Sequence, residues 1–404
     1  MVLDKHNKIV VITTNPFPVG LAATNRILSY GHGFLHHGYQ PEVICIRPTE
    51  PYANVFNNQV SGIYNGIRFS YPGQTTVRVK SFWGRRCKDL VAIFYSILFF
   101  ISLLQKKEVS FSIFYGTNIY NEILFLSISR LFGNKIYKEE SENPNVYFRD
   151  YRSIHNKIIK WFYLNKLYRY YDGVLVMTQP LRNLFLGKGI NDSKILVVPQ
   201  TVDLYRFETT NERNSNNIDY EYIAYVGSLN QNKDGILTLV ESFKNVSKKF
   251  PELKLIIAGD GTIYEKSTIL ALVKSLKLEN RVQLIGRISS EEIPQFLKCA
   301  KVLASCRPAT MQSDYGFPTK VVEYLASGIP TVTTATGELP LYLLDRNNSF
   351  ISNEADSFSF EAKLIEVLED YRFSLEVAKA GKKLVEKMFD SEKNTRLIID
   401  FVNK

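Results

Sequence analysis

Cysteine is scarce in this sequence: there are four in 404 residues, and no two of them form a Cys-x-x-Cys pair. This scarcity argues against a disulfide scaffold and gives no thiolate signature of a structural metal site. Cys45, Cys87, Cys299 and Cys306 are therefore expected to be reduced, buried thiols. Charged residues make up 22% of the chain and hydrophobic residues 45%, which excludes disordered and collagen-like classes and predicts two or three globular domains.

The sequence predicts neither a leader segment nor a run long enough to span a membrane. The N-terminal residues are charged and precede a short apolar run without a small-residue cleavage site, which predicts a first strand rather than a signal peptide. The longest uncharged apolar run is residues 90–104, and 15 residues are too few to cross a bilayer about 30 Å thick. We expect a buried helix there and a cytoplasmic protein. The alternative is a helix in the membrane plane at the inner face of the cell membrane, because Trp83, Arg85, Arg86, Lys88, Lys106 and Lys107 flank the run.

The charge balance is basic, since 50 Lys and Arg stand against 40 Asp and Glu. A net charge of +10 favours anionic partners such as nucleotide phosphates, anionic lipid or nucleic acid. Residues 151–171 mix aromatic and basic side chains, and three interpretations apply. The aromatics pack on a sheet, or the segment docks to a membrane, or it binds RNA. No RNA-binding motif accompanies the segment, so we expect no nucleic-acid partner.

Apolar, β-branched runs alternate with helical stretches in both halves of the chain, which predicts an α/β protein with two doubly wound, parallel-sheet (Rossmann-like) domains. A polar, Asn-rich stretch follows position 203 and reads as a linker. The predicted divisions are residues 1–203, a linker at 204–219, a second domain at 220–385, and a C-terminal helix at 386–404 that crosses back to the first domain. The expected strands are residues 9–13, 43–46, 112–115, 135–137, 173–177 and 195–198, then 222–226, 253–258, 282–285, 302–304 and 331–334.

Ligands of open parallel sheets bind outside the carboxyl ends of the strands, so two such domains predict a site in a cleft between them. Gly227 ends one strand and lets the backbone approach a ligand. Lys233 follows where the loop meets a helix N-terminus, which suits an anion site, although an ordinary turn with a solvated lysine fits equally well. Gly259 ends the next strand in an Asp-Gly turn. Arg287 follows a third strand and either meets an anion or pairs with a carboxylate.

The segment from position 313 to 334 predicts a loop, a helix of about ten residues and a strand, with Pro318 at the first helical position and Gly328 ending the helix. Glu323 lies one turn below Thr319, roughly 6 Å along the axis. That distance suits a nucleoside diphosphate whose phosphates meet the helix N-terminus while the carboxylate accepts ribose hydroxyls. Lys320 adds positive charge near the phosphates. The alternative is a simple Lys320–Glu323 surface pair.

Several motifs in this order resemble glycosyltransferase family 4, of the GT-B architecture with two Rossmann-like domains facing a cleft. In the second half they are YVGSLNQNKDG, LIIAGDG, VQLIGRI and GFPTKVVEYLASGIPTV. The first half matches more loosely through NPFPVGLAATNRI, DGVLVMTQPLRNLF and KILVVPQTVDLYRF. The likeness covers essentially the whole chain and is strongest to bacterial surface-polysaccharide enzymes. It implies that residues 1–203 bind the acceptor and residues 220–385 bind the nucleotide-sugar donor.

The resemblance assigns roles to individual residues. Lys233 corresponds to the lysine that neutralises the diphosphate, Glu323 to the carboxylate that holds the ribose, and Gly20 to a glycine that shapes the acceptor and phosphate pocket. Lys233 and Glu323 are thus the expected catalytic residues. The remaining candidates for the donor nucleotide are Gly227, Ser228, Gly259, Arg287, Phe317, Pro318, Thr319 and Lys320; those for the donor sugar are Asp314, Tyr315 and Gly316; and those for the acceptor are Gly20 and Glu142.

Three positions depart from the family pattern. Ser228 stands where an arginine is common, so the diphosphate charge rests on Lys233 and on Arg287 or Lys320. Tyr315 stands where the first glutamate of a pair usually meets the donor sugar, which leaves the sugar open and allows a modified or deoxy sugar. A family histidine of the first domain is not evident, and Glu140 or Glu142 is a candidate replacement.

The implied reaction is transfer of a sugar from a UDP- or GDP-type nucleotide-sugar, with retention, to a saccharide or polyprenyl-diphosphate-linked acceptor in surface-polysaccharide synthesis. The family needs no metal, and we expect no metal and no cofactor. The nearest Asp-x-Asp-like segment, residues 354–356, reads as a helix cap, and His32 and His36 read as a solvated helix face. Two alternatives stay open: a GT-B-like nucleotide-sugar epimerase, and a catalytically weak partner subunit of a glycosyltransferase.

Overall fold

The chain folds into two compact units of α/β architecture. The computed structural model describes residues 7–53, 55–147, 153–208, 220–353 and 355–404. Unit 1 comprises Met1–Thr201 and Ser391–Lys404, and unit 2 comprises Val202–Asp390. The predicted fold class, two α/β domains with parallel sheets, is confirmed.

Unit 1 is built on an eight-stranded sheet in the order β3-β4-β2-β1-β5-β6-β7-β8. All neighbours run parallel except the β3–β4 hairpin. Runs such as KIVVIT in β1 are almost entirely buried, as expected for a sheet covered on both faces. The strands are β1 (Lys8–Thr13), β2 (Gln40–Cys45), β3 (Ser61–Tyr64), β4 (Ile67–Ser70), β5 (Val109–Tyr115), β6 (Ile136–Glu140), β7 (Gly173–Val176) and β8 (Ile195–Val197).

The helices of unit 1 include the last helix of the chain, α16, which packs against α1. A Cβ on Gly33 of α1 would lie 2.3 Å from Thr395 Oγ1 and 2.5 Å from the Ser391 carbonyl oxygen, so the missing side chain lets the two helices approach closely. Ile398 and Val402 of α16 belong to the same buried cluster as Phe111 of β5. The helices are α1 (Ala22–His36), α2 (Phe82–Gln105), α3 (Ile119–Leu131), α4 (Ile154–Asn165), α5 (Gln179–Gly187) and α16 (Ser391–Val402), with 3₁₀ turns at Pro144–Tyr147, Leu167–Tyr170 and Asp192–Lys194.

Unit 2 is built on a six-stranded, fully parallel sheet in the order β11-β10-β9-β12-β13-β14. The strands are β9 (Tyr222–Ser228), β10 (Lys254–Asp260), β11 (Val282–Gly286), β12 (Val302–Ser305), β13 (Thr331–Thr334) and β14 (Phe350–Ser352). The helices are α6 (Tyr205–Glu208), α7 (Gln231–Asp234), α8 (Ile236–Lys249), α9 (Ile263–Ser275), α10 (Ile293–Lys298), α11 (Met311–Tyr315), α12 (Thr319–Ser327), α13 (Leu339–Tyr342), α14 (Ser357–Glu369) and α15 (Tyr371–Met388).

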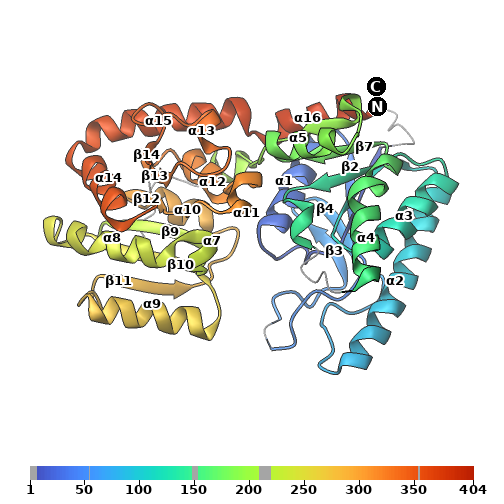
Figure 1. Ribbon diagram of the computed structural model, residues 1–404, viewed down its shortest axis with the longest axis horizontal. Coiled ribbons are helices and arrows are strands. Elements are labelled where there is room, and N and C mark those ends of the chain that lie inside the picture. Colours follow the sequence, from blue (N-terminus) through green and yellow to red (C-terminus); the bar gives the residue numbers. More distant parts are fainter. Residues whose placement is uncertain (1–6, 54, 148–152, 209–219, 354) are drawn as a thin grey trace. The chain divides into compact units, whose positions relative to one another are not determined.

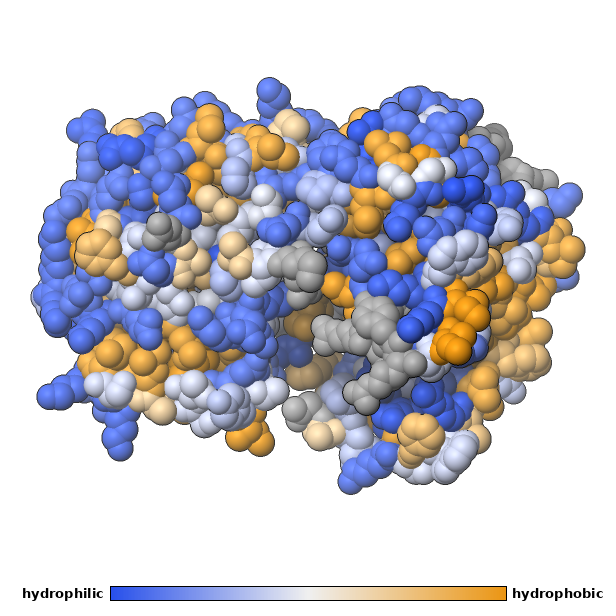
Figure 2. All heavy atoms as spheres, viewed as in Figure 1, coloured by the Kyte–Doolittle hydropathy of each residue, from blue (hydrophilic) through white to orange (hydrophobic). Residues whose placement is uncertain are grey.

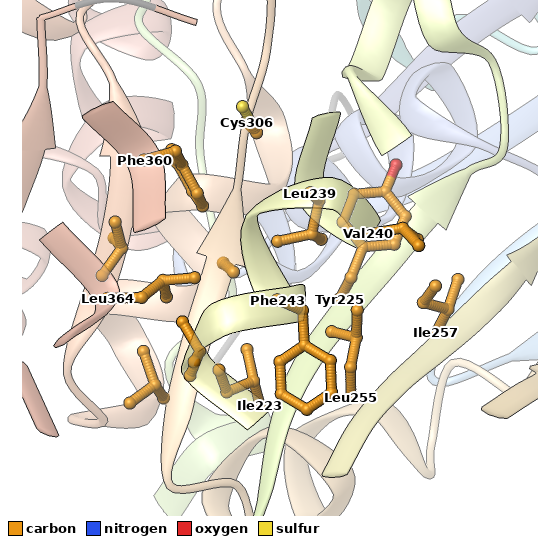
Figure 3. Close-up of a cluster of buried hydrophobic side chains, with 14 of the residues drawn as sticks. Ile223, Tyr225, Leu239, Val240, Phe243, Leu255, Ile257, Cys306, Phe360 and Leu364 are labelled. Carbon is orange, nitrogen blue, oxygen red and sulfur yellow. The ribbon is translucent and has the colours of Figure 1, made fainter. Parts of the chain in front are cut away.

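The core of unit 2 lies between the sheet and the helices α8 and α14, as Figure 3 shows. Phe243 of α8 packs beside Ile223 of β9 and Leu255 of β10, and Leu364 of α14 closes the cluster. Because these side chains come from elements far apart in the sequence, the core fixes the loops at the carboxyl ends of β9 and β12.

Residues 209–219 of the predicted linker lie outside the described residues. The residues before them, Tyr205–Glu208, form α6 of unit 2. The interpretation of residues 90–104 as a buried helix is wrong. They belong to the 24-residue α2, which by length and composition could cross a membrane. Only 28% of the most apolar 18-residue stretch of this helix is buried. The expectation of four buried cysteines also fails, because Cys87 of α2 is exposed and Cys299 is partly exposed.

Candidate functional site

The point where strand order reverses in unit 2 lies between β9 and β12. These two strands pair only at Ile223 and Ala224, whereas β9 pairs with β10 along its whole length. Beyond Ala224, a side chain of α12 forms the hydrogen bonds of β9 on this side. The Val226 N–H donates to Tyr324 Oη at 2.7 Å, and Tyr324 Oη donates to the Val226 carbonyl at 3.3 Å. The helix is therefore fixed at the switch point, where open α/β sheets bind their ligands.

Two glycines bring the strand ends together there. A Cβ on Gly259, at the end of β10, would lie 1.7 Å from the Gly227 carbonyl oxygen. A Cβ on Gly227, near the end of β9, would lie 2.5 Å from Lys320 Nζ. Only glycine allows the ammonium group of Lys320 to rest against the strand end.

Lys320 is held in a polar network with the loop that follows β9. Its Nζ donates to Asp234 Oδ1 at 2.5 Å and to Tyr225 Oη at 2.8 Å. Ser228 Oγ donates to the other oxygen of Asp234 at 2.8 Å, and Tyr225 Oη donates to the Ser228 carbonyl at 2.6 Å. Burial is the main cause of a lowered pKa for Lys320, and Asp234 opposes that shift. Because Asp234 already neutralises Lys320, less of its charge is available to a ligand.

Lys233 lies beside this network with its side chain exposed. It lies in α7, a single helical turn with Asn230 as its N-cap residue. The Lys233 N–H donates to Asn230 Oδ1 at 3.0 Å. The Lys233 charge is close enough to contribute to the lowered pKa of Lys320. A solvent-facing ammonium at the mouth of the switch point suits an anionic ligand.

Glu323 pairs with a residue that the sequence did not single out. Arg206 of α6 donates from Nη1 to Glu323 Oε1 at 3.3 Å and from Nη2 to the Ser290 carbonyl at 2.5 Å. The alternative Lys320–Glu323 surface pair is wrong, because Lys320 pairs with Asp234 instead. Arg206 thus holds one carboxylate oxygen of Glu323 and sets the direction of the other.

The N-terminus of α12 begins one residue later than expected, at Thr319, with Pro318 at the N-cap. The side chain of Pro318 makes no hydrogen bond to the first N–H groups of α12. A helix N-terminus without a capping side chain suits an anion. Phe317 is buried. The centroid of its ring lies 5.5 Å from that of Phe389 and 5.9 Å from that of Tyr342. Phe317 therefore anchors the loop rather than facing solvent.

The other donor-side candidates lie just after β11 and on or just after α11. Arg287 is exposed at the end of the edge strand β11, two strands from β9, where its charge contributes to the lowered pKa of Asp260, whose main cause is Lys266. Asp314 is exposed on the short helix α11, Tyr315 is partly buried, and Gly316 is buried at the end of that helix. The structure thus brings Gly227, Ser228, Lys233, Thr319, Lys320 and Glu323 together. Arg287 is close enough to affect Asp260, which is the register partner of Ser228.

In unit 1 the strand order reverses between β1 and β5. Thr13 Oγ1 donates to the Tyr115 carbonyl at 2.8 Å across this point, and Asn15 Nδ2 donates to the same carbonyl at 3.4 Å. Gly20 lies in the loop after β1, where a Cβ would meet Thr24 Oγ1 at 2.0 Å. Glu142 is partly exposed after β6. Asn15 and Glu142 are partly exposed and give the carboxyl ends of β1 and β6 a polar surface, whereas Thr13 is buried.

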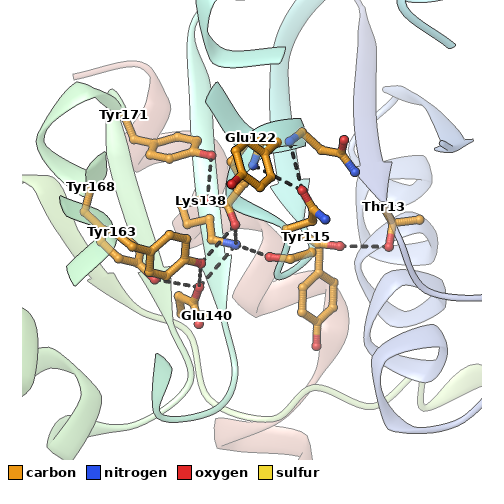
Figure 4. Close-up of polar contacts among 12 residues, drawn as sticks. Thr13, Tyr115, Glu122, Lys138, Glu140, Tyr163, Tyr168 and Tyr171 are labelled. Atoms are coloured by element: carbon orange, nitrogen blue, oxygen red, sulfur yellow. Dashed lines mark hydrogen bonds and ion pairs between the residues drawn. The ribbon is translucent and has the colours of Figure 1, made fainter. Parts of the chain in front are cut away.

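A buried cluster of charges and tyrosines supports this end of unit 1 (Figure 4). Lys138 Nζ lies 3.2 Å from both Glu122 Oε1 and Glu140 Oε1, and it donates to the Gly116 carbonyl in the loop after β5. Glu140 is thus buried, and of the two proposed replacements for the family histidine only Glu142 reaches solvent. Burial, with Glu140 nearby, raises the pKa of Glu122 to about 7 against the pull of Lys138. The hydroxyl groups of Tyr163, Tyr168 and Tyr171 donate to the two carboxylates.

Sequence reasoning missed Asp234, Arg206 and Tyr324. Asp234 and Tyr324 stand inside quoted motifs beside Lys233 and Glu323, but their partners lie about 90 positions away. Arg307, whose charge contributes to the lowered pKa of Lys320, was also missed, although it stands two positions after the end of β12, where the rule for carboxyl ends would have found it. The 354–356 segment acts in part as expected: Asp356 caps α14 by accepting from the N–H groups of Phe358 and Ser359, while residue 354 lies outside the described residues.

Comparison with known proteins finds likeness to glycosyltransferases over parts of the chain. Residues 207–384 match the family model described as Glycosyl transferases group 1. An uncharacterized glycosyltransferase of Methanocaldococcus jannaschii is 28% identical over 218 residues, half of each chain. The N-acetylgalactosamine-N,N'-diacetylbacillosaminyl-diphospho-undecaprenol 4-alpha-N-acetylgalactosaminyltransferase of Campylobacter jejuni is 26% identical over 277 residues, 67% of this chain and 70% of that one.

Likeness to solved structures extends over the whole chain. The structure of HepE from Anabaena in complex with UDP and glucose is 14% identical, with a TM-score of 0.68 over 98% of this chain and 99% of that one. At this identity the likeness concerns the fold. The chain spans about half the length of several curated relatives that it matches.

Proposed function

We propose that this protein, whose residues 207–384 form a group 1 glycosyltransferase domain and whose two units have the GT-B fold, moves a sugar from a nucleotide-sugar to a saccharide acceptor with retention. The observation that carries the proposal is the placement of α12 in the split between β9 and β12, with Lys233 exposed beside its N-terminus and Glu323 one turn along it. We propose further that the reaction needs no metal and no cofactor.

The diphosphate of the donor would lie against Gly227, Ser228 and the first N–H groups of α12. Negative charge builds on the β-phosphate as the glycosidic bond breaks, and fixed donors that meet this charge lower the barrier, each by about 3–4 kcal/mol when fully engaged. Lys233 would supply an exposed cation at the mouth of the site. Lys320 supplies a fixed one that Asp234 restrains, so Lys233 is the lysine on which turnover depends most.

The ribose would lie against Glu323. The distance from Thr319 to Glu323 along α12 is roughly 6 Å, comparable to the separation of phosphate and ribose in a nucleoside diphosphate. Arg206 holds Oε1 of Glu323, which leaves Oε2 for the ribose hydroxyls. A UDP- or GDP-type donor fits this arrangement, and a solved relative of the same fold binds UDP.

The acceptor would be a growing or lipid-linked saccharide of a surface polysaccharide. Support comes from the Campylobacter jejuni relative, whose name describes an undecaprenol-linked substrate. The acceptor would meet the polar carboxyl-end surface of unit 1, where Gly20 shapes the first loop and Glu142 reaches solvent. Glu142 is our candidate for binding an acceptor hydroxyl.

The test is nucleotide binding followed by transfer. Thermal unfolding of the wild type is measured with UDP-, GDP-, ADP- and dTDP-sugars and their free diphosphates, without metal. One nucleotide should raise the melting temperature, and Glu323→Ala should abolish that shift. Glu366→Ala is the matched control, because it removes another Arg–Glu pair of unit 2, with Arg346, and should keep the shift.

The stabilising nucleotide is then supplied as its sugar, with and without lipid-linked saccharide acceptors. Formation of a lengthened acceptor supports the proposal. Interconversion of the sugar nucleotide in the absence of acceptor would instead identify an epimerase. Nucleotide binding without any product would point to a non-catalytic partner subunit, and no binding at all would contradict the donor site.

A further inference from the structure

Unit 1 exposes a broad apolar surface on three neighbouring helices, which we call the α2–α4 face. It consists of the outer sides of α2, α3 and α4, and Figure 2 shows hydrophobic residues gathered along the side of the unit where Figure 1 places α2 and α3. Its large exposed side chains are Leu90, Val91, Phe94, Tyr95 and Leu98 of α2, Tyr120, Ile123, Leu124 and Leu131 of α3, and Ile154, Ile158 and Trp161 of α4. Contiguous apolar patches of this kind mark interaction sites.

The three helices are joined into one surface by their own contacts. The ring of Phe100 in α2 lies 5.6 Å from that of Phe125 in α3. Tyr120 Oη of α3 is hydrogen-bonded to His155 Nε2 of α4 at 3.4 Å. The exposed apolar side chains therefore stand on helices that contact one another in sequence, α2 with α3 and α3 with α4.

The helix α2 lies along this surface instead of leaving the unit. It connects β4 with β5, two strands of one sheet, and one stripe of it stays buried, formed by Ala92, Ser96, Phe100, Leu103 and Leu104. Leu90, Phe94 and Leu98 recur at intervals of four residues on the opposite side and are 68%, 56% and 46% exposed. Only this outer side is free to meet an apolar phase, so α2 would lie in the plane of a membrane.

Positive charge surrounds the apolar side chains. Arg85, Arg86 and Lys88 stand exposed at the start of α2, and Lys106 and Lys107 stand exposed at its end. On α4, Lys157 is exposed next to Ile158, and Lys166 lies with its ammonium 5.6 Å from the Trp161 ring just beyond the helix. Basic residues around an apolar, Trp-bearing face complement an anionic lipid surface, whereas a second copy of the same face would oppose like charges.

We propose that the α2–α4 face docks unit 1 onto an anionic lipid bilayer, with the apolar side chains of α2 inserted at the headgroup boundary. Vesicle binding requires neither donor nor acceptor, so this proposal stands or falls separately from the proposed transfer reaction.

Flotation of the full chain with vesicles tests the docking. One set of vesicles is pure phosphatidylcholine, and the other contains about one-quarter phosphatidylglycerol. The wild type should float with the anionic set, and raised salt should weaken that binding. The Leu90→Glu/Phe94→Glu variant should lower the partition coefficient at least tenfold.

The matched control is Ile263→Glu/Tyr264→Glu, which makes the same change at two still more exposed apolar residues, on α9 of unit 2. It should float like the wild type. Lys157→Glu/Lys166→Glu should weaken binding to anionic vesicles and leave binding to neutral ones unchanged. A circular-dichroism melt of each variant separates loss of docking from loss of fold.

Failure of the wild type to float, or equal flotation of the α2 variant, overturns the proposal. So does a wild type that sediments as a dimer without vesicle binding while the α2 variant sediments as a monomer, since the face would then join two copies of the chain.

Discussion

Charge at the proposed donor site of unit 2 is divided between a restrained lysine and an exposed one. Lys320 is enclosed by Asp234, Tyr225 and the strand end at Gly227. Its charge therefore stabilises the loop after β9 in addition to any bound anion. Lys233 reaches solvent from a single capped turn. A side chain with few protein contacts can move to a phosphate at little cost in folding stability. Lys233 is therefore expected to contribute to turnover alone, and Lys320 to folding stability as well.

Lys233→Ala should therefore lower turnover at least tenfold without changing the melting temperature of the unliganded protein, because the variant removes a transition-state cation but no buried contact. Steady-state rates with the stabilising donor give the turnover. Lys244→Ala, an exposed lysine on α8, is the control and should retain wild-type rates. Unchanged turnover in Lys233→Ala would remove this residue from the mechanism.

At the scale of elements, one hydroxyl group links α12 to β9. Tyr324 Oη bonds both the N–H and the carbonyl of Val226, in the part of β9 where pairing with β12 has ended. The helix thus completes the hydrogen bonding of the strand while presenting its own N-terminus at the switch point. Loss of that hydroxyl should disturb stability and donor binding together.

Tyr324→Phe leaves the Val226 N–H without its acceptor, which should cost about 1–3 kcal/mol of unfolding free energy and weaken nucleotide binding several-fold. Denaturant unfolding and nucleotide titration measure the two effects. Tyr222, at the start of β9, donates from its hydroxyl group to the Phe296 carbonyl of α10. Tyr222→Phe should therefore lower stability while leaving nucleotide affinity intact. Equal loss of affinity in both variants would show that α12 has no special dependence on Tyr324.

The buried cluster of unit 1 ties α3, β6 and α4 together around a single cation. Glu122 and Glu140 share Lys138, and burial favours the protonated form of Glu122, whose pKa rises to about 7 from 4.5. The native state then binds more protons than the unfolded state between these two values. Stability from this group is present below pH 4.5 and is lost as the pH rises through 7.

Replacing Glu122 with Gln should flatten the dependence of unfolding free energy on pH in that window. Above pH 7 the variant should gain on the wild type by up to about 3 kcal/mol relative to the difference at pH 4.5, because an amide has no proton to lose. Denaturant unfolding of both proteins from pH 4.5 to 8 gives the comparison. Parallel curves for the two proteins would contradict the raised pKa.

At the scale of the whole molecule, the chain forms two units, and its last helix returns to the first. Residues 391–404 belong to unit 1, where α16 packs on α1 through Gly33. The residues of the proposed donor site, in contrast, all lie within Val202–Asp390. Damage to the α1–α16 contact should therefore be separable from nucleotide binding.

Gly33→Ala should destabilise unit 1 by about 1–3 kcal/mol, because its Cβ meets the Ser391 backbone, while the nucleotide-induced shift of unit 2 should persist. Scanning calorimetry with and without nucleotide resolves the two effects. Gly187→Ala, in α5 of the same unit, points into open space and should be neutral or stabilising. Loss of the nucleotide shift in Gly33→Ala would show that the units are coupled.

The sequence alone determined the fold class, because buried parallel strands must be continuous apolar runs: each of the eleven expected strands coincides with an observed one. It missed the hairpin strands β3 and β4 and the short β14, whose exposed or brief patterns carry little signal. It placed Lys233 where a loop meets a helix N-terminus and Glu323 one turn along a helix, and their roles remain predictions. Only the tertiary structure decided that Lys320 pairs with Asp234, that Arg206 holds Glu323, and that α2 exposes its apolar side. Pairing and burial depend on which distant segments meet in space, and periodicity along the chain does not record that.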